Sequence, residues 1–148
     1  MLPQFNESGL LPAGIHPCNW SELRERFGYN YSRGLILEGL AKGVKMLQMF
    51  GNPWVYVGGS FVASKEIPGD FDACWTYENL TSQIVENLLG AYPVFMDLEH
   101  PRALQKMAFR GEFFPAFAIE GGSGKTFLDF FQQDKETGLP KGIIHLIL

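Results

Sequence analysis

The sequence predicts a single α/β (α+β) domain, residues 1–148, in which helices flank a mixed sheet. Apolar residues recur at three- and four-residue spacing between residues 32 and 50, which is the period of an amphipathic helix. Short apolar runs bounded by turn residues indicate strands between and after the helical segments. With 148 residues, 46% hydrophobic and 19% charged, the chain is long enough for one core without disulfides or metals.

The first part of the chain contains one clear helix. Residues 1–18 include several glycines and prolines, so we expect an irregular lead-in. Asn19 is a suitable N-cap for a helix from Trp20 to Phe27, with Glu22 as its capping-box acid. Gly28 is expected to end this helix.

A longer helix is expected from Ser32 to Phe50, ended by the Gly-Asn-Pro sequence that follows it. The apolar run 54–57 then predicts a strand, and a second strand is expected around 71–75. Asn79 can cap a further helix that closes at Gly90.

The last third predicts two more helices and two more strands. After Pro93, the run 94–99 is apolar with embedded acids and indicates a strand. Pro101 suits the first turn of a helix that ends at Phe109. A short helix is expected over 126–132 and a closing strand over 143–148.

Charge and composition exclude several classes of function. A net charge of −4 argues against coating duplex DNA or an anionic membrane, because that binding needs many cationic contacts. No apolar run approaches the roughly 20 residues of a membrane-spanning helix, and the N-terminus lacks the pattern of a leader, so we expect a cytoplasmic protein. Cys18 and Cys74 are expected to be free thiols. His16, His100 and His145 have no partner at metal-ligand spacing, which argues against zinc.

A glycine turn and two carboxylates lie close together in the sequence. The strand 54–57 leads into Gly58-Gly59-Ser60, where glycine lets backbone amides approach a phosphate. Either Gly58 or Gly59 can carry the turn. Asp70 and Asp72 bracket one phenylalanine, so an extended backbone places both carboxylates on one face. Paired hard oxygen ligands suit Mg²⁺ or Mn²⁺, although a solvated loop with no metal would have the same Asp-x-Asp pattern.

These residues resemble the motif of the nucleotidyltransferase superfamily. That motif is a hydrophobic residue, Gly, then Gly or Ser, followed some ten residues later by Asp-hydrophobic-Asp/Glu-hydrophobic. Gly59-Ser60 and Asp70-Phe71-Asp72-Ala73 match it. The whole chain is similar to the small single-domain bacterial and phage members. The segments that carry this likeness are residues 11–16, 59–72, 102–114 and 130–142.

The resemblance implies a third metal-site carboxylate on a later strand. Asp97 is the candidate, and Glu99 on the same face is the alternative; either acid could instead meet solvent at a sheet edge. Lys106 belongs to a basic helix face, with arginines four residues before and after it, that could hold a triphosphate or be a solvated stripe.

Two functions follow as expectations. The first is Mg²⁺-dependent transfer of a nucleoside monophosphate from a nucleoside triphosphate to a protein or nucleic-acid hydroxyl. Asp70, Asp72 and Asp97 would be the catalytic and metal-binding residues, and Gly59, Ser60 and Lys106 the nucleotide-binding residues.

The second is a catalytically idle relative that binds a partner protein in a regulatory pair, such as a toxin–antitoxin system or a phage-encoded modulator. Its motivation is the density of phenylalanines at positions 109, 113, 114 and 117, which would make a binding surface unless they form core.

A second glycine-rich segment, 121–126, is similar to a phosphate-binding P-loop. The match fails, because a P-loop needs glycine where this chain has Ile119. A flexible glycine loop is expected there.

Overall fold

A five-stranded mixed sheet forms the centre of the molecule. The computed structural model describes residues 1–99 and 101–148. The strands are β1 (Gly14–Asn19), β2 (Pro53–Gly58), β3 (Phe71–Tyr77), β4 (Gly111–Pro115) and β5 (Gly142–Ile147). Their order is β1-β5-β2-β3-β4; β1 pairs with β5 and β3 with β4 in parallel, whereas β2 is antiparallel to both of its neighbours. The predicted fold class, a mixed sheet flanked by helices, is confirmed.

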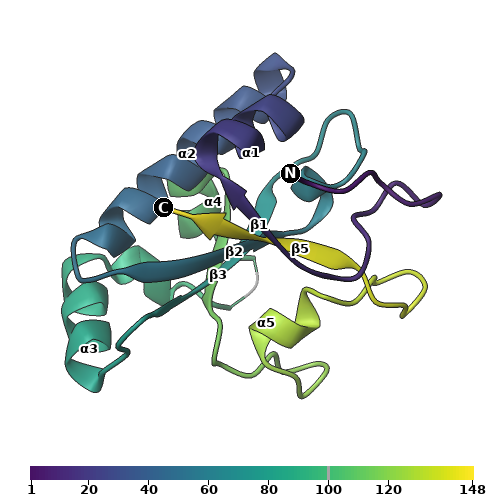
Figure 1. Ribbon diagram of the computed structural model, residues 1–148. Coiled ribbons are helices and arrows are strands. Elements are labelled where there is room, and N and C mark those ends of the chain that lie inside the picture. Colours follow the sequence, from purple (N-terminus) through teal and green to yellow (C-terminus); the bar gives the residue numbers. More distant parts are fainter. Residues whose placement is uncertain (100) are drawn as a thin grey trace.

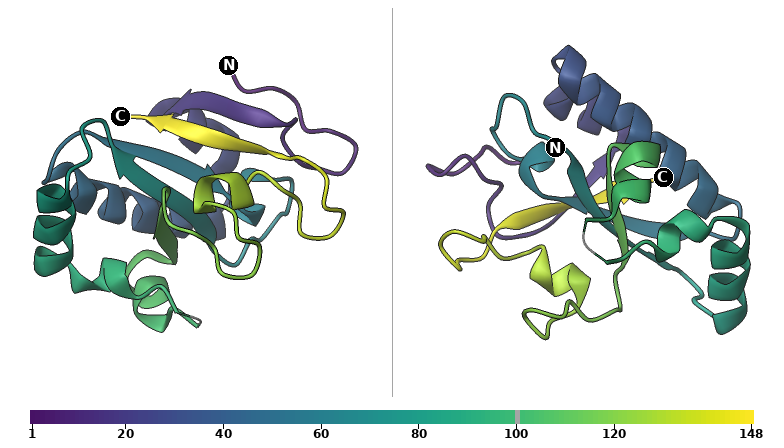
Figure 2. Two further views of the ribbon diagram at one scale, coloured as in Figure 1. Left: turned by 90° about the horizontal axis from the view of Figure 1, so that it is seen from below. Right: turned by 180° about the vertical axis from the view of Figure 1, so that it is seen from behind.

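Helices lie on both faces of this sheet (Figures 1 and 2). The α-helices are α1 (Trp20–Phe27), α2 (Tyr31–Gln48), α3 (Ser82–Ala91), α4 (Ala103–Phe109) and α5 (Phe127–Phe130), and the 3₁₀ helices are η1 (Ser60–Val62) and η2 (Pro93–Met96). Helices α1, α2 and α4 cover one face, over the main core, and α5 packs against the other face. No helix within residues 1–99 and 101–148 has the length and apolar character needed to cross a membrane.

The N-terminal helices form as their caps and periodicity predict. The side chain of Asn19 accepts a hydrogen bond from the Glu22 amide at 2.9 Å, and the Glu22 carboxylate accepts one from the Asn19 amide at 3.3 Å, which completes the capping box. Gly28 is the C-cap of α1. Helix α2 buries the expected apolar stripe, whose members are Ile36, Leu37, Leu40, Val44 and Leu47.

Two glycines bring α2 close to its neighbours. A Cβ atom on Gly39 would lie 1.7 Å from the carbonyl oxygen of Phe109, and one on Gly43 would lie 2.3 Å from the ring of Phe113. Helix α2 therefore packs with its backbone against the end of α4 and against β4. This contact positions α4 and β4 beside β3, the strand that contains Asp72.

The irregular lead-in is only partly confirmed. Residues 14–19, which overlap the predicted lead-in 1–18, form the edge strand β1 in parallel register with β5. Pro17 is compatible with this role because an edge strand needs ladder hydrogen bonds on one side only. The glycines and prolines of this segment disfavour a strand locally, and β1 forms because it pairs with β5, the last strand of the chain.

The predicted strand over 94–99 is wrong. Pro93–Met96 form the 3₁₀ helix η2. A short apolar run alone does not distinguish a strand from a buried helical turn. The strand that belongs to this part of the fold is β4, which the sequence analysis did not predict. Helix α3 is capped by Thr81 rather than Asn79, and it extends through Gly90.

Candidate functional site

The backbone conformation after β2 shows whether Gly58 or Gly59 forms the turn. Gly59 has φ +77°, and a Cβ atom there would lie 2.6 Å from Oδ2 of Asp72. Gly58 is the last residue of β2, where it pairs with Asp72, and its φ is not positive. Gly59 therefore carries the turn, and Ser60 begins η1 directly after it.

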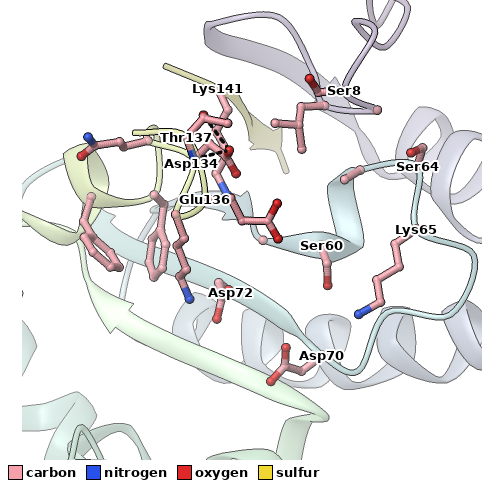
Figure 3. Close-up of a pocket in the computed structure, with 18 residues that line it drawn as sticks. Ser8, Ser60, Ser64, Lys65, Asp70, Asp72, Asp134, Glu136, Thr137 and Lys141 are labelled. Carbon is pink, nitrogen blue, oxygen red and sulfur yellow. Dashed lines mark hydrogen bonds between the residues drawn. The ribbon is translucent and has the colours of Figure 1, made fainter. Parts of the chain in front are cut away.

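The two aspartates line the same cavity. Phe71 is fully buried between them, and the carboxylates of Asp70 and Asp72 both point into a cavity of about 530 Å³ (Figure 3). Ser60 and Lys65 face these carboxylates from the opposite wall. We call this cavity the first lobe. Asp72 is in β3 and Asp70 directly precedes that strand, and alternation along an extended backbone places both acids on one face while the phenyl ring enters the core.

Burial and the charges of neighbouring carboxylates raise the pKa values of Asp70 and Asp72. Burial, followed by the charges of Asp70 and Glu112, raises the pKa of Asp72 to about 6. Burial and then the charge of Glu112 also raise the pKa of Asp70. Lys135 acts in the opposite direction on both pKa values. The negative charges are thus only partly compensated by the protein, and a bound cation would favour the ionised forms.

Glu112 is the third acid of this cluster. It lies on β4, its Cα is the register partner of Asp72 on β3, and its side chain is buried. Its carboxylate forms ion pairs with Nε of Arg102 and, at 3.3 Å, with Nζ of Lys106. Lys106, predicted to hold phosphate, therefore contacts an acid of the site directly.

Glu112 was not predicted from the sequence, and Asp97 was expected in its place, because the third strand lies at Gly111–Pro115 and not at residues 94–99. The Asp97 carboxylate instead accepts hydrogen bonds from the amides of Leu104 and Gln105, at 3.0 and 3.3 Å, at the start of α4. Glu99 is exposed, and neither Asp97 nor Glu99 lines the first lobe. The acid in the apolar sequence Gly111–Pro115 was the signal available in the sequence.

The donor set suits a hard divalent cation only in part. Among the residues that the structure describes, no group of three or more His, Cys, Asp or Glu side chains is arranged to hold a metal ion. Asp70 and Asp72 offer half-buried carboxylate oxygens that repel one another, which fits Mg²⁺ or Mn²⁺ with further ligands from water and phosphate. The Glu112 carboxylate is already paired with Arg102 and Lys106.

A second hollow adjoins the first lobe. It also measures about 530 Å³, and it shares Ser60, Lys65 and Asp70 with the first lobe. Its remaining lining is Ser32, Leu35, Ile36, Gly69, Lys106 and Arg110. We call it the second lobe. Asp70 thus faces two hollows, whereas Asp72 faces only the first.

A buried arginine holds the loop between the turn and Asp70. The guanidinium of Arg33, on α2, donates to the carbonyl oxygens of Phe27 and Phe61 at 3.1 and 2.7 Å. It also donates to Ala63 at 3.0 Å and to Lys65. Arg33 therefore ties the segment after η1 to α2 and fixes one wall of both lobes.

A tight loop forms the opposite rim of the first lobe. The Asp134 carboxylate accepts hydrogen bonds from the amide and hydroxyl of Thr137, at 3.1 and 2.7 Å. This arrangement places Lys135 at the lobe, and Lys141 lines it where the loop returns to β5. Burial lowers the pKa of Lys141, while the charge of Asp72 acts against that shift.

The glycine-rich segment 121–126 has a different role from a P-loop. The Glu120 carboxylate accepts hydrogen bonds from the amides of Gly122 and Ser123, at 2.9 and 2.7 Å. Amides that would face a phosphate in a P-loop are thus directed at an acid of the same loop.

The phenylalanine-rich segment is mostly core. Phe109, Phe113 and Phe114 are buried, and only Phe117 is exposed, at 47%. The expected aromatic binding surface is therefore reduced to one side chain. Cys18 and Cys74 are free and buried, as predicted.

Comparison with known proteins identifies a family without a described activity. A family model with the description "Family of unknown function (DUF6932)" matches residues 3–147. No curated protein and no solved structure matches the chain.

Proposed function

The chain belongs to the DUF6932 family, and from its site we propose that it is a Mg²⁺-dependent nucleotidyltransferase. It would move a nucleoside monophosphate from a nucleoside triphosphate to a hydroxyl of a protein or nucleic acid. One observation carries this proposal: Asp70 and Asp72 line one cavity together with Gly59 and Ser60, and Glu112 lies beside Asp72 in the register of β3 and β4. Paired acids next to a glycine turn that admits phosphate are what nucleotidyl transfer requires.

Each residue has a role that its surroundings support. Asp70 and Asp72 would hold the cation, which when bound neutralises charge on the triphosphate. Ser60 would donate to the terminal phosphates, and Lys135 and Lys141 would balance their charge from the cavity walls.

Glu112, rather than Asp97, is the third acid beside the carboxylate pair. The acceptor oxygen forms a bond to the α-phosphorus, the bond from that phosphorus to pyrophosphate breaks, and the hydroxyl proton passes to Asp70, which faces both lobes. Glu112 is buried and lines neither lobe, so it would act by positioning its neighbours. Arg102 and Lys106 hold the Glu112 carboxylate in place. Catalysis then comes mostly from positioning and charge stabilisation.

The test is transfer of label from α-phosphate-labelled nucleoside triphosphates, with Mg²⁺ or Mn²⁺, to components of a cell extract. We expect Asp70→Asn to abolish transfer and Glu112→Gln to reduce it. Asp97→Asn is the matched control: it should retain transfer while losing about 1 kcal/mol of stability at the start of α4. Transfer that survives Asp70→Asn would refute the proposal, and loss of transfer in Asp97→Asn alone would restore Asp97 as the third acid.

One observation favours a second candidate, a catalytically idle module of a regulatory pair. Glu112 is already neutralised by Arg102 and Lys106, so the cluster holds together without a metal. In that case no nucleoside triphosphate, with Mg²⁺ or Mn²⁺, should raise the melting temperature, because only a ligand of the folded state does so. A clear shift would exclude this candidate.

A further inference from the structure

The two lobes meet at the carboxylate that both of them share. In an in-line displacement the attacking and leaving oxygens lie on opposite sides of the phosphorus, so the acceptor and the triphosphate approach from different directions. The first lobe contains both aspartates together with Lys135 and Lys141. The second lobe reaches Asp70 from the side of α2 and α4. If the triphosphate occupies the first lobe, the second is the route for the acceptor.

The second lobe is cationic although the whole chain is acidic. Lys65, Lys106 and Arg110 line it against a single carboxylate, Asp70, in a chain of net charge −4. Lys106 is paired with Glu112, but no ion pair involves Lys65 or Arg110 among the described residues. Two cations without an acidic partner at the mouth of one cavity favour an anionic ligand.

The uncharged residues that line the second lobe indicate which kind of anionic ligand fits it. Leu35 and Ile36, from α2, form an apolar wall, and Ser32 adds a hydroxyl. Such a wall beside two cations fits a nucleotide unit, with its base or ribose on the apolar side and its phosphate at Lys65 and Arg110. A cavity of about 530 Å³ admits one nucleotide unit but not a duplex, so a single strand is favoured.

We propose that the second lobe binds the 3′-terminal nucleotide of a single-stranded nucleic acid and presents its hydroxyl to Asp70. This inference rests on the proposed function and identifies its acceptor. A protein hydroxyl would fit the lobe only on a strongly acidic segment, and that alternative is an outcome of the test.

The test measures binding without nucleoside triphosphate or divalent cation. A short fluorescent single-stranded oligonucleotide with a free 3′-hydroxyl is titrated with protein and followed by anisotropy at several salt concentrations. Arg110→Glu should weaken binding about tenfold or more, since it replaces an attraction by a repulsion. Lys45→Glu, on the exposed part of α2 outside both lobes, makes the same change in net charge and should leave binding nearly unchanged.

A second variant addresses backbone effects. Arg110 has φ +58°, so Arg110→Asn keeps a residue that tolerates this conformation. It should lower the dependence of log K on log salt by about 0.7, the value for one lost phosphate contact on a single strand. Melting curves of both variants confirm that they fold.

The outcomes are distinct from those of the transferase assay. The inference is overturned if the wild-type protein does not bind the oligonucleotide or if Arg110→Glu binds as tightly as Lys45→Glu. It is also overturned if an acidic peptide displaces the oligonucleotide at equal concentration, which would assign the lobe to a protein acceptor. Oligonucleotide binding without any response to nucleoside triphosphates would reject the transferase and leave the lobe assignment standing.

Discussion

The variant Gly59→Ala tests whether the turn at Gly59 fixes the position of the Asp72 carboxylate without being needed for folding. The alanine would have to adopt φ +77° and ψ −170°, a region that is essentially limited to glycine and costs about 1–3 kcal/mol. Its Cβ would also lie 2.6 Å from Oδ2, 3.2 Å from Cγ and 3.4 Å from Cβ of Asp72. The close contact is with the end of a side chain, so Asp72 can rotate away. A domain with an ordinary stability of about 5–15 kcal/mol remains folded.

The expected result is a modest loss of stability with a large loss of ligand response. Urea denaturation should show about 1–3 kcal/mol of destabilisation. The melting-temperature increase produced by Mg²⁺ and a nucleoside triphosphate should disappear, because the rotated Asp72 no longer faces the first lobe with Asp70.

Gly58→Ala is the matched control for Gly59→Ala. Its Cβ would meet Cγ2 of Ile143 at 3.3 Å and Cβ of Phe131 at 3.4 Å, and its φ is not positive. This variant should keep the response to ligand. If Gly59→Ala responds to ligand as the wild-type protein does, or if Gly58→Ala alone loses the response, the assignment of the turn to Gly59 is wrong.

Three further predictions concern stability. Because folding raises the pKa of Asp72 from 3.8 to about 6, the folded state binds this proton more tightly, and stability should fall as pH rises between these values. Asp72→Asn should therefore stabilise the protein above pH 6 by about 3 kcal/mol but not near pH 4, in urea titrations; an equal effect at both pH values would contradict the shift. Arg33→Met should cost about 3–5 kcal/mol in denaturation, since it leaves buried carbonyl groups without donors, and a cost below about 1 kcal/mol would exclude that role. Gly39→Ala should lower the melting temperature far more than Gly34→Ala on the same helix, because only Gly39 contacts backbone, at 1.7 Å from the Phe109 oxygen.

Local patterns identified much of the fold. The capping box around Asn19, the apolar stripe of α2 and the strands β2, β3 and β5 lie where the sequence predicts them, within a few residues. Caps and periodicity act between residues that are close in the chain, so these signals are readable without tertiary information. Asp72 in β3 and Asp70 directly before it belong to the same category, since alternation along an extended backbone places both acids on one face.

Long-range pairing accounts for the elements that were missed. Strand β1 is stabilised by β5, at the other end of the chain, and the local sequence with its glycine and prolines argues against a strand. Strand β4 depends on its parallel register with β3 and on the close approach of α2 at Gly39 and Gly43. Propensity carries no information about either partner.

The carboxylate pair and the glycine turn can thus be predicted from the sequence alone, because each depends on residues that are close together in the chain. The third acid cannot, since Glu112 meets Asp72 only through the register of two parallel strands joined by a crossover of helices. The same register brings Arg102 and Lys106 to Glu112 and leaves Asp97 at the start of α4. A one-residue shift in that pairing would turn Glu112 to the other face of the sheet, which is why its place follows from packing rather than from local sequence.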